Sequence, residues 1–284
     1  MRTTTLHPDF GVEIHDIDLT QITARDGYPE IRAAFEDHSL LLFRGQSWDD
    51  DDILKFGALW GPIENRTDGP LFVPKVSNIL PDGSVSLPDA LHTKNLKANM
   101  LWHTDGTFLP DPALANIITA RVVPSSGGMT ELVSTRAGLA RLPEDQRAIL
   151  QDATIRHRYA HSRQKIDPEL TKMDIIAKWP DQHWRGVWRN PVNGHDAVYI
   201  ASHACAIDGM ADSKALPLID KIIAAMTRPE DIYSHQWRVG DVLIWDERAT
   251  LHRGQPWPFE EPRELASICI SSTDADGLSG MRSG

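Results

Sequence analysis

Residues 240–254 read GDVLIWDERATLHRG and give the clearest indication of the fold class. The run Val242–Asp246 is almost entirely apolar and follows a glycine, which is typical of a short buried strand. Further candidate strands in the second half of the chain lie at Ala115–Arg121, Glu131–Ser134, Ala153–Arg158, Ala197–Ser202, His235–Trp237 and Glu264–Ser272. Many short strands separated by glycine-bearing turns predict an antiparallel sandwich or barrel, a set that includes the jelly roll.

Helices are predicted between and before these strands. The candidates are a short stretch at 31–35, a segment that opens at Asp49–Asp52 and runs to Trp60, Pro143–Gln151 and Ser213–Met226, with two further strands at Val12–Leu19 and Ser39–Phe43. We interpret the acidic run Asp49–Asp52 as helix capping rather than as a metal site, because carboxylates are favourable at a helix N-terminus. The prediction is an α+β protein in which helices flank a β-barrel.

The chain is expected to form a single domain over residues 1–284. Its length allows two domains, but a single large barrel of about 250 residues is common, and we find no repeat or linker. The nearest candidate boundary is 69–98, where four prolines are expected to interrupt any helix. We predict a long loop inside the domain that acts as a lid, because long loops in compact proteins are often functional.

The composition argues against several classes of protein. The chain has 29 Lys and Arg against 40 Asp and Glu, a formal net charge of −11, whereas nucleic-acid binding needs a basic face. No apolar run approaches the ~18 residues of a membrane span, and the first residues contain no apolar signal stretch. The two cysteines, Cys205 and Cys269, cannot form a disulfide framework. We therefore expect a cytoplasmic protein that binds neither nucleic acid nor membranes.

The segment Trp102–Gly106 offers two metal ligands. Residues i and i+2 of an extended segment project from the same face, so His103 and Asp105 can approach one metal ion. His252, in the stretch quoted first, is a candidate third ligand. Two histidines and one carboxylate form the facial triad of non-haem Fe(II) oxygenases. A zinc-dependent hydrolase can use the same ligand types, and a metal-free binding module is expected if the three side chains point apart.

The surrounding residues resemble the taurine and 2,4-dichlorophenoxyacetate dioxygenase (TauD/TfdA) family of Fe(II)- and 2-oxoglutarate-dependent enzymes. The resemblance spans nearly the whole chain and rests on a joint pattern of Trp102-His103-Thr104-Asp105, the Ser126–Thr130 turn, Gly240-Asp241 through Trp245-Asp246 to His252-Arg253, and Arg263, with further matches at Leu42–Gln46, Gly57–Gly61, Ser202–Ala204 and Gly209-Met210. It implies a double-stranded β-helix, that is, a jelly-roll barrel with flanking helices.

The resemblance also implies a role for each matching residue. His103, Asp105 and His252 would hold Fe(II), while Thr130 and Arg263 would bind the distal carboxylate of 2-oxoglutarate. A guanidinium suits that carboxylate because it donates two parallel hydrogen bonds. The implied reaction consumes O2, converts 2-oxoglutarate to succinate and CO2, and hydroxylates a small-molecule substrate. The family often assembles as homo-oligomers. A zinc hydrolase would leave Thr130 and Arg263 without a role.

The substrate is less constrained than the chemistry. The taurine and 2,4-dichlorophenoxyacetate branches carry a second arginine four residues after the cosubstrate arginine, and this chain has Ser267 there. The usual anion clamp is therefore missing. Asn99 and His203 match family positions beside the pocket, so Asn99, His203 and Ser267 are the candidate substrate-binding residues. Another cation would have to serve an anionic substrate, and the candidates are Lys94, Lys97 and Arg163.

Two substrate classes remain. The stretch from His235 to Phe259 resembles enzymes that cleave phenoxypropionate-type compounds, which favours an aryloxyalkanoate substrate. Hydroxylation next to the ether oxygen gives a hemiacetal, which collapses to a phenol and a keto acid or aldehyde. The alternative is the same chemistry on a different small molecule in secondary metabolism.

Overall fold

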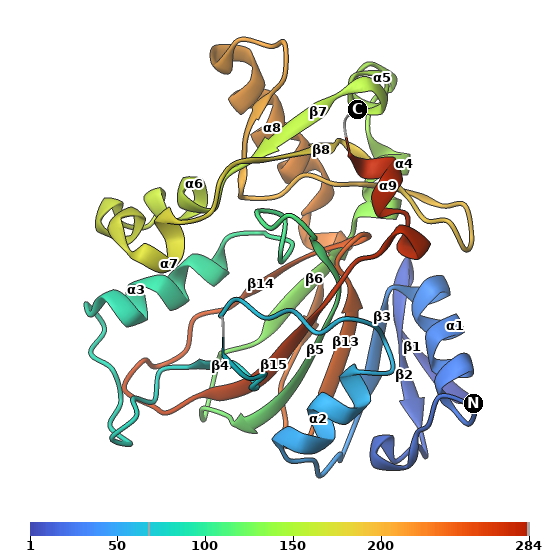
Figure 1. The fold of residues 1–284 in the computed structure, drawn as a ribbon, viewed down its shortest axis with the longest axis vertical. Helices are drawn as coiled ribbons and strands as arrows, with labels where there is room; N and C mark the ends of the chain where they lie inside the picture. The colour runs from blue at the N-terminus through green and yellow to red at the C-terminus, as the bar shows by residue number, and fades with distance from the viewer. Residues whose placement is uncertain (68, 283–284) are drawn as a thin grey trace.

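The computed structural model describes residues 1–67 and 69–282, and two sheets form the jelly-roll barrel at its centre (Figure 1). The larger sheet has the strand order β1-β2-β3-β13-β5-β15-β4 and the smaller sheet the order β12-β6-β14. Neighbouring strands are antiparallel except β2 and β3. The strands are β1 (Arg2–His7), β2 (Phe10–His15), β3 (Leu40–Phe43), β4 (Lys75–Ser77), β5 (Ala113–Val122), β6 (Thr130–Ser134), β12 (Tyr233–His235), β13 (Val242–Asp246), β14 (Thr250–Gly254) and β15 (Glu264–Ser271).

Helices and two small sheets surround this barrel. The helices are α1 (Tyr28–His38), α2 (Asp50–Gly57), α3 (Leu91–Lys97), α4 (Thr135–Arg141), α5 (Glu144–Asp152), α6 (Tyr159–Gln164), α7 (Asp174–Ala177), α8 (Asp212–Met226) and α9 (Leu278–Met281). The small sheets pair β9 (Val187–Arg189) with β10 (Asp196–Val198), and β7 (Thr154–His157) with β8 (Gln182–Arg185) and β11 (Ala204–Ile207). Within the described residues, no helix is long and apolar enough to span a membrane.

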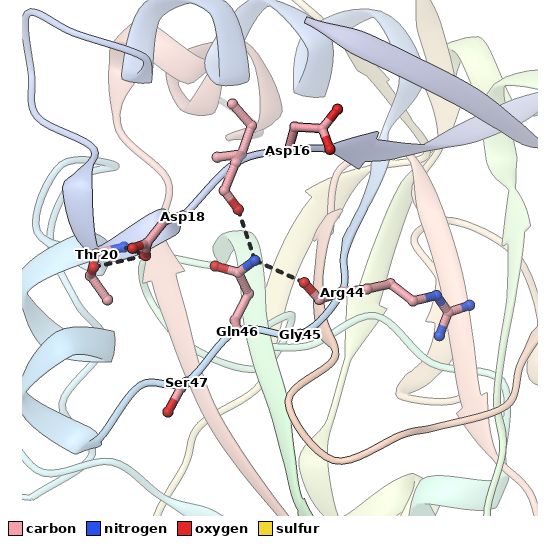
Figure 2. Close-up of a pocket in the computed structure, with 8 residues that line it drawn as sticks. Asp16, Asp18, Thr20, Arg44, Gly45, Gln46 and Ser47 are labelled. Carbon is pink, nitrogen blue, oxygen red and sulfur yellow. Dashed lines mark hydrogen bonds between the residues drawn. The ribbon is translucent and has the colours of Figure 1, made fainter.

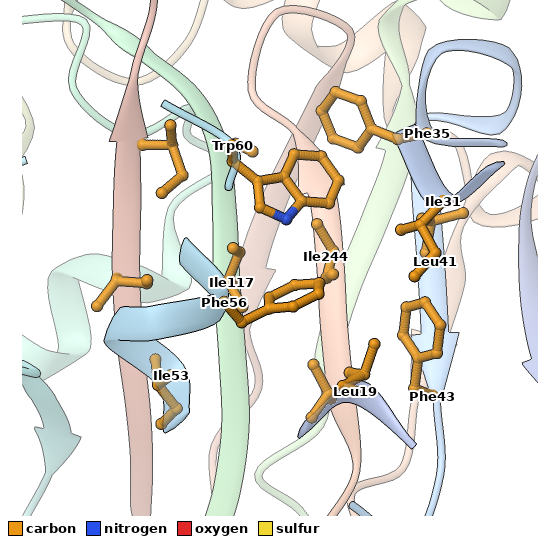
Figure 3. Packing of buried hydrophobic residues seen from close by; sticks show 14 of the residues in the cluster. Leu19, Ile31, Phe35, Leu41, Phe43, Ile53, Phe56, Trp60, Ile117 and Ile244 are labelled. Atoms are coloured by element: carbon orange, nitrogen blue, oxygen red, sulfur yellow. The ribbon is translucent and has the colours of Figure 1, made fainter. Parts of the chain in front are cut away.

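Successive side chains along the strands of the larger sheet point to opposite faces and so form two separate apolar clusters. In β3, Leu41 and Phe43 pack outward beneath α1 and α2, while Leu40 and Leu42 pack into the barrel interior. Figure 3 shows the outer cluster, in which Phe35 and Trp60 lie against the strands. Burial of each large apolar side chain stabilises the fold by about 1.5–3 kcal/mol. Ile118, Trp245 and Leu265 of the inner cluster also line the pocket described below.

The predicted capping role of the acidic run is confirmed. Asp49 is the N-cap of α2, and its carboxylate accepts a hydrogen bond from the backbone N–H of Asp52 at 3.0 Å. The Asp52 carboxylate accepts in return from the Asp49 N–H at 3.2 Å. This reciprocal arrangement is a capping box. The Asp50 carboxylate instead pairs with Lys75 of β4, so α2 is tied to the edge of the larger sheet.

The predicted strand at Ala197–Ser202 is wrong in its extent. The structure has β10 at Asp196–Val198 and β11 at Ala204–Ile207, with an irregular segment between them. The chain leaves the extended path because the Ser202 N–H donates to the Trp102 carbonyl and the Ala204 N–H closes a turn on Ala201. The predicted strand Val12–Leu19 also ends early, at His15, because Asp16 adopts a positive φ of 60°.

The prediction that prolines keep residues 69–98 free of helix is wrong. This segment contains β4, which pairs with β15 at the edge of the larger sheet, and α3 at Leu91–Lys97. All four prolines precede α3, so its residues keep the backbone N–H groups that a helix requires. The helices α4, α6, α7 and α9 are further elements that periodicity did not indicate, and each is seven residues or shorter.

Figure 2 shows a polar surface depression where the ends of β2 and β3 approach each other. The Gln46 side chain holds the two loops together. Its Nε2 donates to the carbonyls of Ile17 and Arg44, each at 2.9 Å, and its Oε1 accepts from the Leu19 N–H. Gly240 lies against this loop at φ +83°, and a Cβ there would meet the Gln46 carbonyl at 2.8 Å. The Leu42–Gln46 match therefore has a structural role.

Candidate metal and cosubstrate site

Backbone pairing brings the two predicted histidine ligands together. His103 and His252 form an isolated antiparallel bridge in which each N–H donates to the other's carbonyl at 2.9 Å. Their ring centroids are 4.1 Å apart. His252 lies in β14, which is paired with β6, while His103 precedes β5 of the opposite sheet. The bridge therefore closes the barrel at the position of the candidate ligands.

Asp105 completes the predicted set. Its Oδ1 lies 3.8 Å from His103 Nε2 and its Oδ2 lies 3.8 Å from His252 Nε2. One ligand atom from each of the three residues falls within 4.8 Å of the others. That separation is the span expected of three atoms around one divalent ion, with ligand bonds of about 2.0–2.2 Å. The three residues fit a metal centre by donor type and by spacing.

The local environment leaves these side chains in metal-binding form. His103 Nδ1 lies 2.7 Å from the Leu101 carbonyl, to which only a protonated nitrogen can donate, so Nε2 carries the free lone pair. Burial lowers the pKa of His103, and burial together with His103 lowers the pKa of His252 to about 3. Burial raises the pKa of Asp105, but His252 and His103 outweigh it and lower the value to about 2. Neutral imidazoles and a carboxylate are the forms that coordinate a metal.

Asn116, Glu247 and Ser267 surround Asp105. The sequence analysis did not identify Asn116 or Glu247 as site residues, and it assigned Ser267 to substrate binding. Asn116 Nδ2 donates to Asp105 Oδ2 at 2.8 Å, and the Ser267 hydroxyl donates to Asn116 Oδ1, also at 2.8 Å. Glu247 accepts from the Asp105 N–H at 3.0 Å and from Trp245 Nε1 at 2.7 Å. Asn116 is a polar residue in a largely apolar strand, and Glu247 stands beside the matched Asp246. These two features were the available signals.

Arg263 and Thr130 line the same pocket as the three candidate ligands. Arg263 is 5% exposed, and its Nη2 donates to the Gly128 carbonyl at 2.9 Å. No carboxylate pairs with it among the residues described. Burial lowers its pKa to about 10, so it stays charged at neutral pH. Thr130 Oγ1 accepts from Trp237 Nε1 at 3.0 Å, which leaves the hydroxyl proton free to donate.

The glycine-rich turn before β6 explains how Arg263 is held. Gly128 has φ +67°, and a Cβ at this position would lie 3.0 Å from Arg263 Nε. A side chain at Gly127 would meet the Pro256 carbonyl at 2.4 Å. Glycines therefore let the turn pass closely over the guanidinium, whose other contact is the Trp257 ring at 4.9 Å. A buried, unpaired guanidinium beside a free hydroxyl fits the distal carboxylate of 2-oxoglutarate.

The pocket has a volume of about 390 Å³ and opens beside 69–98. Of the candidate substrate-binding residues, Asn99 and Ser267 line it. His203 is buried at 1% exposure behind Arg163, with its Nε2 3.3 Å from Arg163 Nη1 and its Nδ1 3.3 Å from the Thr107 hydroxyl. Much of the remaining wall is apolar or aromatic and includes Leu71, Phe72, Leu96, Met100, Ile118, Tyr159, Ile175, Trp245, Trp257 and Leu265. Polar and charged residues also line the pocket, among them Glu64, Arg66, Lys75 and Arg163.

A family model described as taurine catabolism dioxygenase TauD, TfdA family matches residues 2–269. The chain belongs to this family. Over 270 residues it is 31% identical to the alpha-ketoglutarate-dependent 2,4-dichlorophenoxyacetate dioxygenase of Cupriavidus pinatubonensis, covering 92% of this chain and 94% of the relative. Over 258 residues it is 29% identical to the (S)-phenoxypropionate/alpha-ketoglutarate-dioxygenase of Delftia acidovorans, with 84% of each covered.

Structural similarity agrees with the family assignment. The crystal structure of AAD-2 in complex with Mn(II) and N-oxalylglycine matches with a TM-score of 0.89 at 26% identity, covering 96% of this chain and 98% of that chain. Mn(II) and N-oxalylglycine substitute there for Fe(II) and 2-oxoglutarate. The protein is thus a 2-oxoglutarate-dependent dioxygenase that uses Fe(II) and O2. A zinc hydrolase and a metal-free binding module are not favoured.

Proposed function

We propose that this dioxygenase hydroxylates an aryloxyalkanoate at the carbon next to the ether oxygen. His103, Asp105 and His252 hold Fe(II) in this proposal, and Arg263 with Thr130 binds the distal carboxylate of 2-oxoglutarate. One observation carries it: three ligand atoms within 4.8 Å and a buried, unpaired guanidinium line one pocket. The aryloxyalkanoate class is supported by the names of the relatives and by the apolar wall of the pocket.

The chain's own residues orient the reactants. When bound, Fe(II) with O2 supplies the oxidative decarboxylation of 2-oxoglutarate and the oxidising power that hydroxylates the substrate. Arg263 fixes the far end of the cosubstrate through two charge-assisted hydrogen bonds, and Thr130 adds its hydroxyl proton. Trp257 covers the guanidinium at 4.9 Å and limits the access of water. The hydroxylated product is a hemiacetal that breaks down to a phenol and a carbonyl compound.

The test is substrate-dependent succinate formation by the purified protein with Fe(II), 2-oxoglutarate and O2. We expect succinate and a phenol in equal amounts when 2,4-dichlorophenoxyacetate or 2-phenoxypropionate is added. Asp105→Ala is expected to abolish both products, because it removes one of three metal ligands. Succinate without phenol for every aryloxyalkanoate would refute the substrate class. Failure to consume 2-oxoglutarate with any small molecule would refute the assigned site.

Residues 69–98 are proposed to close over the pocket as a lid. Leu71 and Phe72 are largely exposed, yet both line the pocket, so closure would bury apolar surface against a bound aromatic ring. We expect trypsin to cleave after Lys75 and Lys97 more slowly when substrate and 2-oxoglutarate are present. Cleavage after Lys221, in α8, serves as the control. Equal protection at all three sites would contradict a lid.

The compartment and the assembly state complete the proposal. We propose a cytoplasmic location, since Fe(II) and the two unpaired cysteines suit a reducing environment. We also propose a homo-oligomer, as is common in this family. Light scattering on the purified protein would measure its mass, and a mass near the 31.7 kDa of one chain would contradict the oligomer.

A further inference from the structure

One guanidinium in the pocket has neither a counterion nor a role in the proposed function. Lysine and arginine side chains line the pocket at Arg66, Lys75, Arg163 and Arg263. Arg66 pairs with Glu64, and Lys75 pairs with Asp50. Arg163 has no carboxylate partner within the described part of the chain. Of the other cations suggested by the sequence, Lys94 pairs with Asp167 at 2.7 Å, and Lys97 donates to the Pro88 carbonyl.

Neutral groups hold Arg163 in place. It lies in α6 and is 6% exposed. Its Nη2 donates to the Tyr159 hydroxyl at 3.2 Å, and its Nη1 lies 3.0 Å from the Ser162 hydroxyl and 3.3 Å from His203 Nε2. Burial and the charge of Arg163 hold the pKa of His203 well below its usual range, so the ring accepts as neutral imidazole. Arg163 Nε has no hydrogen-bond acceptor among the residues described.

The charges around the site leave Arg163 uncompensated. A divalent metal and Arg263 together balance the charge of Asp105 and the two carboxylates of 2-oxoglutarate. The Arg66–Glu64 pair is neutral overall. Arg163 is therefore a buried positive charge that no carboxylate of the described residues compensates. A buried charge without a counterion is costly, and a ligand with a single negative charge would remove that cost.

We propose that Arg163 is the anion clamp for the substrate and takes over the role of the arginine that Ser267 replaces. This inference rests on the proposed function, because it assigns the carboxylate of an aryloxyalkanoate to a residue of that site. Arg163 donates to the carboxylate, and Tyr159, whose oxygen accepts from Arg163, adds its hydroxyl proton. Tyr159 stacks on Phe108 at a ring separation of 3.9 Å, which fixes the position of its hydroxyl oxygen.

Arg163 approaches the pocket from a different side than an arginine at position 267, on β15, would. Arg163 enters from α6, outside the barrel, while Ser267 lies on the barrel wall and binds Asn116. The His203 ring, which contacts Arg163, lies 6.5 Å from the ring of His103. A carboxylate at Arg163 is thus close to the metal ligands but on the helical side of the pocket. His203 acts in this arrangement as a positioning residue for Arg163.

The experiment compares a charged ligand with its neutral analogue. Equilibrium binding of 2,4-dichlorophenoxyacetate and of its amide is measured by calorimetry on anaerobic enzyme loaded with Fe(II) and 2-oxoglutarate. Michaelis constants come from succinate formation in air. Arg163→Met is expected to raise the Kd and KM for the carboxylate by roughly 100-fold, since hydrogen bonds to charged groups are strong. The Kd for the amide and the KM for the cosubstrate should change by less than about 3-fold.

Arg158→Met provides the matched control. Arg158 immediately precedes α6 but pairs with Asp181 at the surface, and its side chain is 48% exposed. Arg158→Met should leave the Kd values for the carboxylate and for the amide unchanged. If Arg163→Met does not fold, Arg163→Lys and Tyr159→Phe replace it, each with an expected rise of roughly 5- to 20-fold in the Kd for the carboxylate alone.

Each outcome separates the clamp from the proposed function. Wild-type turnover of the carboxylate with an unchanged Kd in Arg163→Met would overturn the clamp and leave the function intact. Wild-type binding without turnover, weakened in Arg163→Met, would support the clamp and overturn the function. An equal loss of affinity for carboxylate and amide would mean that Arg163 only supports α6, which also overturns the clamp.

Discussion

Two buried arginines, Arg248 behind the barrel and Arg263 in the pocket, are surrounded in opposite ways. Arg248 is 2% exposed, and its guanidinium donates to Asp246 at 2.9 Å and to Glu36 at 2.7 Å. Arg263 is 5% exposed, yet its guanidinium donates only to one backbone carbonyl among the described residues. Burial lowers the pKa of Arg263. Burial also acts to lower the pKa of Arg248, but the carboxylates of Asp246 and Glu36 outweigh it and raise that pKa.

The difference distinguishes an arginine that stabilises the fold from an arginine that we propose to bind a ligand. Glu36 belongs to α1, and Arg248 also donates to the Asp276 carbonyl near the C-terminus, so one guanidinium joins three distant segments. It lies in the turn between β13 and β14 and thereby fixes the approach to His252. Arg263 makes no such connection within the described chain. The described residues provide counterions for the structural charge but none for Arg263, the charge that we propose binds the cosubstrate.

The largest expected effect is the loss of stability in Arg248→Met. Removing the guanidinium leaves Asp246 and Glu36 buried without their main partner, which typically costs about 3–5 kcal/mol. Urea denaturation at pH 7 would measure this as a lower free energy of unfolding. Arg189→Met, which breaks the exposed pair with Asp196, should cost less than about 1 kcal/mol. If the two substitutions lower the free energy of unfolding equally, the structural role assigned to Arg248 is wrong.

Arg263→Met should show the reverse behaviour. We expect 2-oxoglutarate to bind roughly 100-fold more weakly, because a bidentate charged contact is lost. The free energy of unfolding without cosubstrate should stay the same or rise by about 1 kcal/mol, since a buried unpaired charge is removed. Calorimetry and urea denaturation would measure the two quantities. A destabilisation comparable to that of Arg248→Met would show that Arg263 is structural.

His157 illustrates a third way to bury a titratable group, which is to keep it neutral. It is fully buried, neither ring nitrogen has a hydrogen-bond partner among the described residues, and burial followed by the charge of His183 lowers its pKa to about 3. Well above pH 6.5 the ring is neutral in both folded and unfolded chains, so it contributes no pH dependence there. As the pH falls further, only the unfolded chain takes up the proton, and stability is lost down to about pH 3.

The expected loss from His157 between about pH 6.5 and pH 5 is about 2 kcal/mol. His157→Leu should remove this part of the acid sensitivity. The measurement is the free energy of unfolding at the two pH values for wild type and variant. His195→Leu, which removes an exposed histidine instead of a buried one, is the control substitution. A variant that loses stability with acid as steeply as wild type would contradict the neutral assignment.

Local sequence pattern was enough for part of this architecture. The apolar run in β13, the acidic cap of α2 and the position of α8 all depend on nearby residues, and the structure has each of them close to where the sequence predicts it. The spacing of His103 and Asp105 likewise placed both on one face. Their meeting with His252 depends on a backbone bridge between distant segments, which no local periodicity encodes. The family resemblance supplied that link.

The residues that surround the ligands were harder to predict for the same reason. Asn116 lies in a largely apolar strand, and its role depends on the hydrogen bond that it donates to Asp105. The short α6 has no clear periodicity, so the burial of Arg163 could not be foreseen from its sequence. Charge balance becomes visible only when the partners of every cation are known in space. Lys94, for example, looked as available as Arg163 until Asp167 was placed beside it.

The smallest expected effect tests whether Ser267, on β15, helps to orient the Asp105 carboxylate. The Ser267 hydroxyl donates to Asn116, whose amide donates to Asp105, so Ser267→Ala is expected to loosen a candidate metal ligand through one intermediate residue. Substitutions in direct contact with ligands typically weaken metal binding by roughly 10- to 100-fold, so we expect about 3- to 10-fold here. Competition with a chelator for Mn(II) would measure it, with Ser271→Ala on the same strand as the control. If Ser267 instead contacts the substrate, as the sequence suggested, the KM for the carboxylate will rise while metal affinity stays unchanged.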